Sequence, residues 1–235
     1  MLYQKSKSAS RADAIHAAVV RVLPTTEALA TLTKIAADAN PRVRLEAVRV
    51  LGKLGTARAA DVALGVLDKP MDAFLDYALW LTMNELATPW LAAVRSGAWN
   101  FQGREAHLAF GLKAVEPTLA GEVLAQLLAD RVLPRDGSGP WLELIGSAGG
   151  VREQRKLFEA VRANGFADTG APRALVALGD ASRLRGVKPD GDLEKLASVL
   201  SAPAEATRVA ALQLVGTWKV QALAPAVVKR AGDAA

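Results

Sequence analysis

The sequence predicts an all-α fold, an α-solenoid of about six helix pairs wound into a right-handed superhelix. The first indication is periodicity, because apolar residues recur at i, i+3, i+4 and i+7, the spacing of one helix face. The second is that no useful stretch alternates polar and apolar residues as a strand does. The third is turn residues about every 30 positions, a period typical of stacked helical repeats.

The expected helices form consecutive pairs within a single repeat domain over residues 1–235. The pairs are expected at about 25–55, 56–86, 88–115, 117–148, 150–185 and 189–217. Unpaired helices are expected at 12–23 and 219–232, after a flexible N-terminal segment at 1–11. The stability of such an array is roughly the sum of each repeat's own stability and its contacts with neighbours.

The clearest single helix begins after Asn40 and ends near Gly55. Asn40 can accept a hydrogen bond from a free N–H at the helix start, and Pro41 suits the first turn because it has no N–H to satisfy. Gly55 favours termination, and Thr56 can cap the next helix. One face of this helix is apolar, and its residues are Val43, Ala47, Val50, Leu51 and Leu54.

Two segments far apart in the chain share one pattern. Both Arg44–Gly52 and Arg208–Gly216 read R-ϕ-x-A-ϕ-x-ϕ-ϕ-G, where ϕ is apolar, and a weaker copy lies at 104–111. Recurrence at matching helix positions indicates repeats, each of which buries its apolar face against the next.

The pattern D-x-N-P-R-V-R-x-x-A-x-x-x-L-G, from Asp38 to Gly52, resembles the second half of a HEAT repeat. The resemblance implies that Asp38 and Arg44 are structural residues, forming a ladder that joins successive repeats. It also implies that the second helix of each pair lines a concave surface.

A longer resemblance covers about residues 36–92. The stretch Leu67–Leu86, followed by Pro89 and Trp90, is similar to the HEAT region of planctomycete-type haem-binding, membrane-bound dehydrogenase-like multidomain proteins. Such proteins place a β-propeller dehydrogenase domain before the helical repeats and a cytochrome c domain after them. The resemblance implies that this chain is the connecting array of an exported parent, and it assigns redox chemistry to no residue here.

Charge and cysteine content narrow the function classes. The formal net charge is +5, but residues 1–55 hold nine basic and four acidic side chains, whereas residues 56–235 hold 20 of each. A nucleic-acid-binding protein usually has basic side chains along its whole binding surface. The confinement of the excess positive charge to residues 1–55 therefore argues against nucleic acid as a partner. The absence of cysteine excludes disulfides, thiolate metal sites and c-type haem attachment. No apolar stretch is long enough to span a bilayer, and we expect the polar start at 1–11 not to act as a secretion signal.

A stripe of cations is the first candidate partner-binding feature. Arg42, Arg49 and Lys53 are spaced i, i+7 and i+11 on the helix that follows Asn40, which places them on one side, opposite its apolar face. They could recognise an acidic partner surface, although Glu46 falls in the same stripe. The alternative is an ordinary solvated helix face.

Aromatic residues concentrate between 74 and 101. Phe74, Tyr77 and Trp80 lie on a helix that is apolar nearly all round, which predicts structural residues buried between repeats. Trp90, Trp99 and Phe101 lie near expected loops and allow two interpretations. They fill the same core between repeats, or they form an exposed docking platform, because exposed aromatics are common binding hot spots.

No catalytic, metal-binding or cofactor-binding residue is predicted. The two histidines, His16 and His107, lie far apart, and His107 is expected to be a hydrogen-bonded histidine of the core or groove. The function expected is a non-catalytic scaffold that binds another protein or the neighbouring domains of its own parent chain, a larger redox protein. The alternative is an enzyme or nucleic-acid-binding module built on HEAT-like repeats, similar to the helical-repeat DNA glycosylases or to the bilin lyases.

Overall fold

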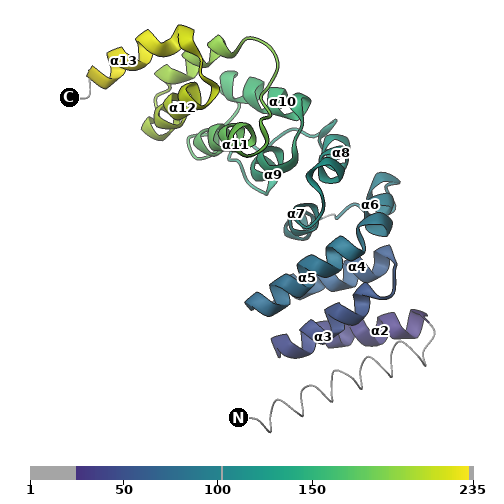
Figure 1. Cartoon of the computed structure of the whole chain (residues 1–235). Helices are drawn as coiled ribbons and strands as arrows, with labels where there is room; N and C mark the ends of the chain where they lie inside the picture. Colours follow the sequence, from purple (N-terminus) through teal and green to yellow (C-terminus); the bar gives the residue numbers. More distant parts are fainter. Residues whose placement is uncertain (1–24, 102, 233–235) are drawn as a thin grey trace. The chain divides into compact units, whose positions relative to one another are not determined.

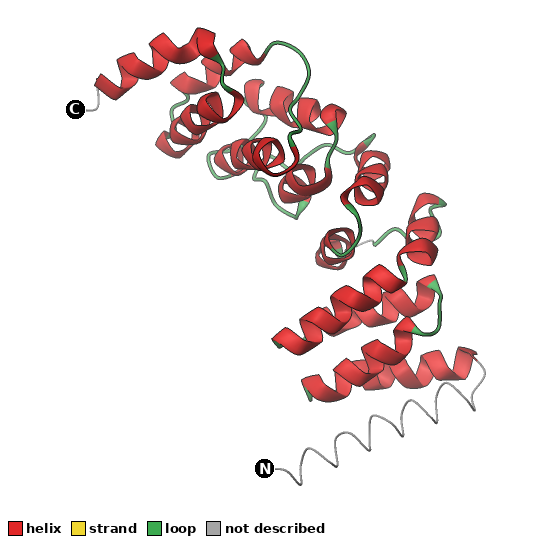
Figure 2. Ribbon diagram, in the orientation of Figure 1, coloured by secondary structure: helices red, strands yellow, loops and turns green. Residues whose placement is uncertain are grey.

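The structure is a computed structural model that describes residues 25–101 and 103–232. Over these residues every regular element is a helix, as Figures 1 and 2 show, and the predicted all-α solenoid class is confirmed. The helix expected at 12–23, the segment 1–11 and His16 lie outside the described residues.

The chain divides into two compact units, and the first is Met1–Val115. Its helices are α2 (Thr25–Ala36), α3 (Pro41–Gly52), α4 (Ala57–Leu64), the 3-10 helix η1 (Gly65–Asp68), α5 (Ala73–Glu85), α6 (Ala87–Arg95) and α7 (Glu105–Lys113). Helix α2 packs on α3 and α4 packs on α5, as the first two expected pairs require, whereas α6 and α7 pack mainly on α4 and α5. Helix α3 packs on both α2 and α5, so the first two pairs are stacked through their second helices.

The second unit is Glu116–Ala235. Its elements are α8 (Pro117–Leu128), α9 (Trp141–Ala148), α10 (Val151–Arg162), α11 (Gly170–Arg185), η2 (Leu193–Ser201), α12 (Glu205–Trp218), η3 (Gln221–Leu223) and α13 (Ala224–Gly232). Helix α11 packs between α9 and α12, again second helix on second helix. The first member of the last pair is a 3-10 helix rather than an α-helix. A single repeat domain over residues 1–235 stays a prediction.

The local signals around α3 act as the sequence predicts. The Asn40 side chain accepts a hydrogen bond from the N–H of Arg42 at 3.0 Å, and Pro41 opens the helix. The Thr56 side chain caps α4 by accepting from Ala59 N at 3.1 Å. Gly55 has a φ of 65°, in the left-handed region that favours glycine, and it follows the end of α3 by three residues.

Arg44 joins the first two pairs, but not through the carboxylate of Asp38. The buried guanidinium donates from Nη1 to the carbonyl oxygens of Asp38 at 2.9 Å and Ala39 at 3.1 Å, and from Nη2 to that of Pro70 in the next pair. The Asp38 carboxylate instead accepts from Asn40 N at 2.7 Å. The predicted ladder contact between the Asp38 carboxylate and Arg44 is therefore wrong. The backbone carbonyls that follow the end of α2 also need hydrogen-bond donors, and the Arg44 guanidinium binds these carbonyls instead of the carboxylate.

The same contact recurs where the sequence pattern recurs. Arg208 donates from Nη1 to the carbonyls of Ala202 at 3.0 Å and Pro203 at 2.6 Å, at the same spacings as Arg44. Other cations also reach backbone carbonyls in a neighbouring element. They are Lys69 to Ala37, Lys156 to Leu128 and Arg131, Arg185 to Gly146 and Gly149, and Lys188 to Trp218. Part of the basic content thus has a structural role at helix ends, where cations are favoured by the helix dipole.

Candidate functional site

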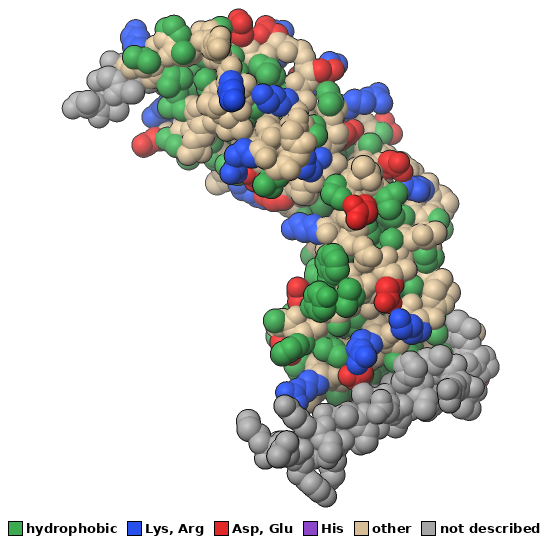
Figure 3. All heavy atoms as spheres, in the orientation of Figure 1, with side chains coloured by type: hydrophobic (Ala, Val, Ile, Leu, Met, Phe, Trp, Pro, Cys, Tyr) green, Lys and Arg blue, Asp and Glu red, His purple; other side chains and the backbone are tan. Residues whose placement is uncertain are grey.

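A groove of about 430 Å³ lies between α3 and α5, the second helices of the first two pairs. Helix α3 lines it with Leu45, Glu46, Arg49, Val50 and Lys53, and α5 lines it with Phe74, Tyr77, Ala78, Leu81, Thr82 and Glu85. Figure 3 shows hydrophobic side chains gathered over α5 on the visible face. The groove therefore has one charged wall and one hydrophobic wall.

The floor of this groove is tightly packed. Val50 of α3 and Ala78 and Thr82 of α5 are buried there. The Thr82 hydroxyl donates to the carbonyl oxygen of Val48 at 3.2 Å, which ties the two helices together. Because the floor is buried and hydrogen-bonded, the exposed side chains above it stand on a rigid base.

The hydrophobic wall corrects the prediction that Phe74, Tyr77 and Trp80 are buried core residues. Their exposed fractions are 77% for Phe74, 61% for Tyr77 and 41% for Trp80, and Leu81 is 39% exposed. These four residues, here named the α5 stripe, cover one side of the helix, and the Tyr77 and Trp80 rings stack with centroids 6.2 Å apart. The buried residues of α5 are Leu75, Ala78, Leu79, Thr82 and Met83. Neighbouring helices cover only this second side of α5. The helix therefore carries apolar residues on every side but is buried on one side only.

The structure decides between the two interpretations of Trp90 and Trp99, because these rings pack in the core and do not form an exposed platform. Trp90 is fully buried and donates from Nε1 to the carbonyl of Met83 at 3.0 Å. Trp99 is half-buried and stacks on buried Phe101 with ring centroids 4.0 Å apart, and both rings meet Trp90 edge-on at 6.3 Å. The chain after α6 folds back, with Trp99 N donating to the carbonyl of Ala93, and this return covers the indole of Trp90.

The charged wall holds two of the three predicted cations. Arg49 pairs with Glu46 of its own helix at 3.3 Å, and Lys53 pairs across the groove with Glu85 at 3.4 Å. Arg42 is exposed in the first turn of α3 and does not line the groove. The structure thus places Arg49 and Lys53 beside the α5 stripe, a combination that the sequence alone did not indicate.

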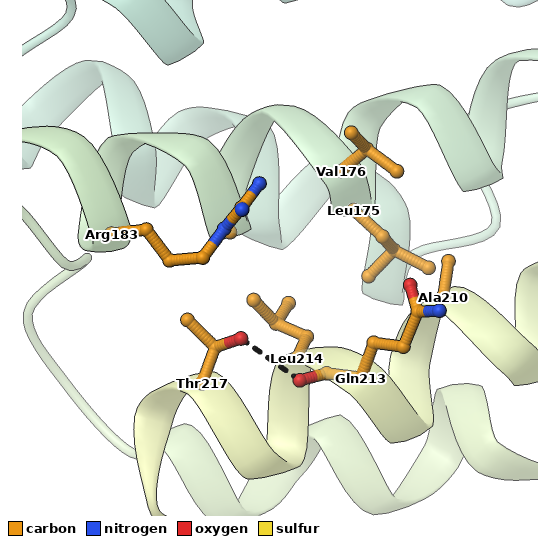
Figure 4. Close-up of a pocket in the computed structure, with 8 residues that line it drawn as sticks. Leu175, Val176, Arg183, Ala210, Gln213, Leu214 and Thr217 are labelled. Carbon is orange, nitrogen blue, oxygen red and sulfur yellow. Dashed lines mark hydrogen bonds between the residues drawn. The ribbon is translucent and has the colours of Figure 1, made fainter.

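A second groove, of about 450 Å³, lies between α11 and α12 in the other unit (Figure 4). Its lining is Leu175, Val176, Gly179, Arg183, Ala210, Gln213, Leu214 and Thr217. Arg183 pairs with Asp180, and the Thr217 hydroxyl donates to the carbonyl of Gln213 at 3.0 Å. No aromatic side chain lines this groove. Nothing in the sequence pointed to this groove except the small lining residues Gly179 and Ala210.

His107 has a structural place in the first unit. The side chain is buried, and its Nε2 lies 2.8 Å from Oδ1 of Asp68 at the end of η1. This confirms a hydrogen-bonded histidine. Within residues 25–101 and 103–232, no group of His, Cys, Asp and Glu side chains could hold a metal ion, and no helix is long and apolar enough to cross a membrane.

Comparison with known families agrees with the helix pairing. Residues 2–80 match a family described as HEAT repeats, and this range contains α3 and most of α5, the two walls of the first groove. The chain is therefore an all-α helical-repeat protein with a HEAT-repeat region in its first third. HEAT repeats commonly mediate binding between proteins. No curated protein and no solved structure matches the chain. The dehydrogenase-like parent stays a prediction.

Proposed function

We propose that this chain is a non-catalytic protein-binding scaffold and that the groove between α3 and α5 is where its partner binds. The observation that carries the proposal is the α5 stripe, four large hydrophobic side chains exposed on one side of one helix. Exposed patches of this kind mark interaction surfaces, and Trp and Tyr are enriched among the residues that supply most binding energy.

The surroundings of the α5 stripe support the same function. The packed floor fixes the backbone positions from which Phe74, Tyr77 and Leu81 project, so a partner does not have to order the helix itself. The ion pairs of Arg49 and Lys53 form a polar border beside them. A hydrophobic centre with a polar rim is the usual anatomy of a protein interface.

The experiment selects ligands and then asks where they bind. Random peptides of about 16 residues, long enough for roughly four helical turns, are displayed on phage and selected on the intact chain. Selected peptides are then measured on the Tyr77→Ser/Leu81→Ser variant. The matched control is Val176→Ser/Val209→Ser, which changes two exposed valines of the α11 and α12 surface.

We expect the groove variant to bind at least about tenfold more weakly, because it loses two hydrophobic anchors, and the control to bind as the wild type does. Far-UV circular dichroism and urea unfolding check that both variants remain folded. Equal binding to wild type and groove variant would contradict the proposal.

The proposal includes a partner located in the same longer polypeptide. The resemblance to dehydrogenase-like multidomain proteins predicts a redox parent with domains on both sides of the repeats. Reading the gene beyond residues 1 and 235 tests this. A β-propeller upstream and C-x-x-C-H downstream would support that parent, and an unrelated or absent flank would contradict it.

A further inference from the structure

We infer that the partner of the α3–α5 groove is a helical segment with hydrophobic residues along one side and carboxylates beside them. This inference rests on the proposed function and adds the chemistry of the ligand. It follows from the spacing of the α5 stripe and from the unequal exposure of the charges on the opposite wall.

The hydrophobic wall has helical spacing. Phe74, Tyr77 and Leu81 lie at i, i+3 and i+7, and the wall extends to Glu85 over about 16 Å, close to three turns. A partner helix meets such a surface through side chains at i, i+3, i+4 and i+7. Binding by strand addition needs free backbone groups on the receptor, and helix α5 uses its own within the helix.

The cations of the charged wall reach further into solvent than their acidic partners. The Arg49 side chain is 66% exposed against 24% for Glu46, and Lys53 is 57% exposed against 48% for Glu85. A ligand therefore reaches the Arg49 guanidinium more readily than the Glu46 carboxylate, whereas Lys53 and Glu85 are almost equally exposed. The carboxylate of Glu46 is largely covered and is a poor target for a basic ligand.

Both existing ion pairs are easily exchanged. Their N–O distances of 3.3 and 3.4 Å exceed the 2.7–2.9 Å of strong charge-assisted hydrogen bonds. Exposed pairs contribute little to stability. A partner carboxylate can therefore take Arg49 or Lys53 without disturbing the fold.

Arg42 extends the positive wall beyond the groove. Arg42 lies at one end of the cation stripe, seven residues before Arg49. The side of α3 that carries this stripe therefore has three cations, counting Lys53 just after the helix, and one acid, Glu46. On α5, Glu85 is at the far end, and Asp76 is exposed outside the groove lining. The charge facing a ligand from α3 is therefore positive, which complements carboxylates.

The test compares matched peptides on the intact chain by fluorescence anisotropy. One groove-binding peptide from the selection keeps its hydrophobic positions and carries Glu, Gln or Lys at its remaining positions. We expect the Glu peptide to bind about tenfold more tightly than the Lys peptide at low salt, with the difference shrinking as ionic strength rises.

Variants of the charged wall sharpen the test. Arg49→Glu/Lys53→Glu is expected to reverse the preference, and Glu85→Gln, which leaves Lys53 without its partner, to strengthen binding of the Glu peptide. Arg183→Glu in the α11–α12 groove is the matched control and should change nothing.

The possible failures are distinguishable. If the Lys or Gln peptide binds as well as the Glu peptide while Tyr77→Ser/Leu81→Ser still weakens all three, the inference is overturned and the proposed function stands. If Tyr77→Ser/Leu81→Ser leaves binding unchanged, the groove is not the site and both are overturned.

Discussion

Two aromatic clusters of the first unit lie close in the sequence and have opposite environments. The α5 stripe faces outward, and its aromatic contact is the stack of Tyr77 on Trp80. The cluster of Trp90, Trp99 and Phe101 is packed ring against ring, and Trp90 also has a hydrogen bond to Met83. The same residue types are thus buried in one place and exposed in the other.

The difference in burial between the two clusters arises from the path of the chain that follows each of them. After α6 the chain turns back over Trp90, and a left-handed residue, Phe101 with a φ of 52°, directs its ring inward. No described segment returns over the α5 stripe. The number of aromatic residues therefore sets how much apolar surface a segment could bury. Whether that surface is buried depends on where the following segment of the chain runs.

The largest expected effect separates the two clusters by stability. Trp90→Ala should lower the free energy of unfolding by about 4 kcal/mol, because it empties a fully buried site. Trp80→Ala should cost roughly 1–2 kcal/mol, because Trp80 is 41% exposed and loses only part of its buried area together with its stack on Tyr77. Urea unfolding of both variants measures the difference, and similar losses in the two would contradict the environments described here.

An intermediate effect separates the two sides of α5. Thr82→Val should cost about 1 kcal/mol, because the buried hydrogen bond to the carbonyl of Val48 is lost. Tyr77→Phe removes an exposed hydroxyl and should leave stability unchanged within about 0.5 kcal/mol. Thermal and urea unfolding give both values, and a larger cost for Tyr77→Phe would show that its hydroxyl is buried and hydrogen-bonded.

The smallest effect concerns the stack on the α5 stripe. A double-mutant cycle of Tyr77→Ala and Trp80→Ala should give a coupling energy of about 0.5 kcal/mol, the low end for aromatic pairs, because both rings are exposed. The unfolding free energies of the wild type, the two single variants and the double variant provide it. A coupling of several kcal/mol would indicate a buried pair.

Much of the fold follows from local sequence. The limits of α3 and the start of α4 depend on Asn40, Pro41 and Thr56, whose capping contacts involve residues two or three positions away. The helical period and the repeated Arg pattern are likewise properties of short segments. Such features are predictable because the interacting groups are neighbours in the chain.

The candidate site was predictable only in part. The stripe containing Arg49 and Lys53 follows from helical spacing, and those side chains are exposed as expected. The side of α5 that faces outward depends on contacts with α3, α4, α6 and α7, which the sequence of α5 does not encode locally. The partner of Arg44 was missed for a related reason, since backbone carbonyls are present at every residue and leave no mark in a sequence pattern.

The carbonyl contacts of Arg44 and Arg208 have a consequence for pH. A joint between a guanidinium and an ordinary carboxylate weakens near pH 4, where the carboxylate takes up a proton. Carbonyl oxygens do not titrate there, and arginine stays charged in proteins. Hydrogen exchange around Pro70 and Pro203 should therefore show similar protection at pH 3 and pH 7 for as long as the chain stays folded. Acid therefore does not remove the arginine–carbonyl contacts at Pro70 and Pro203.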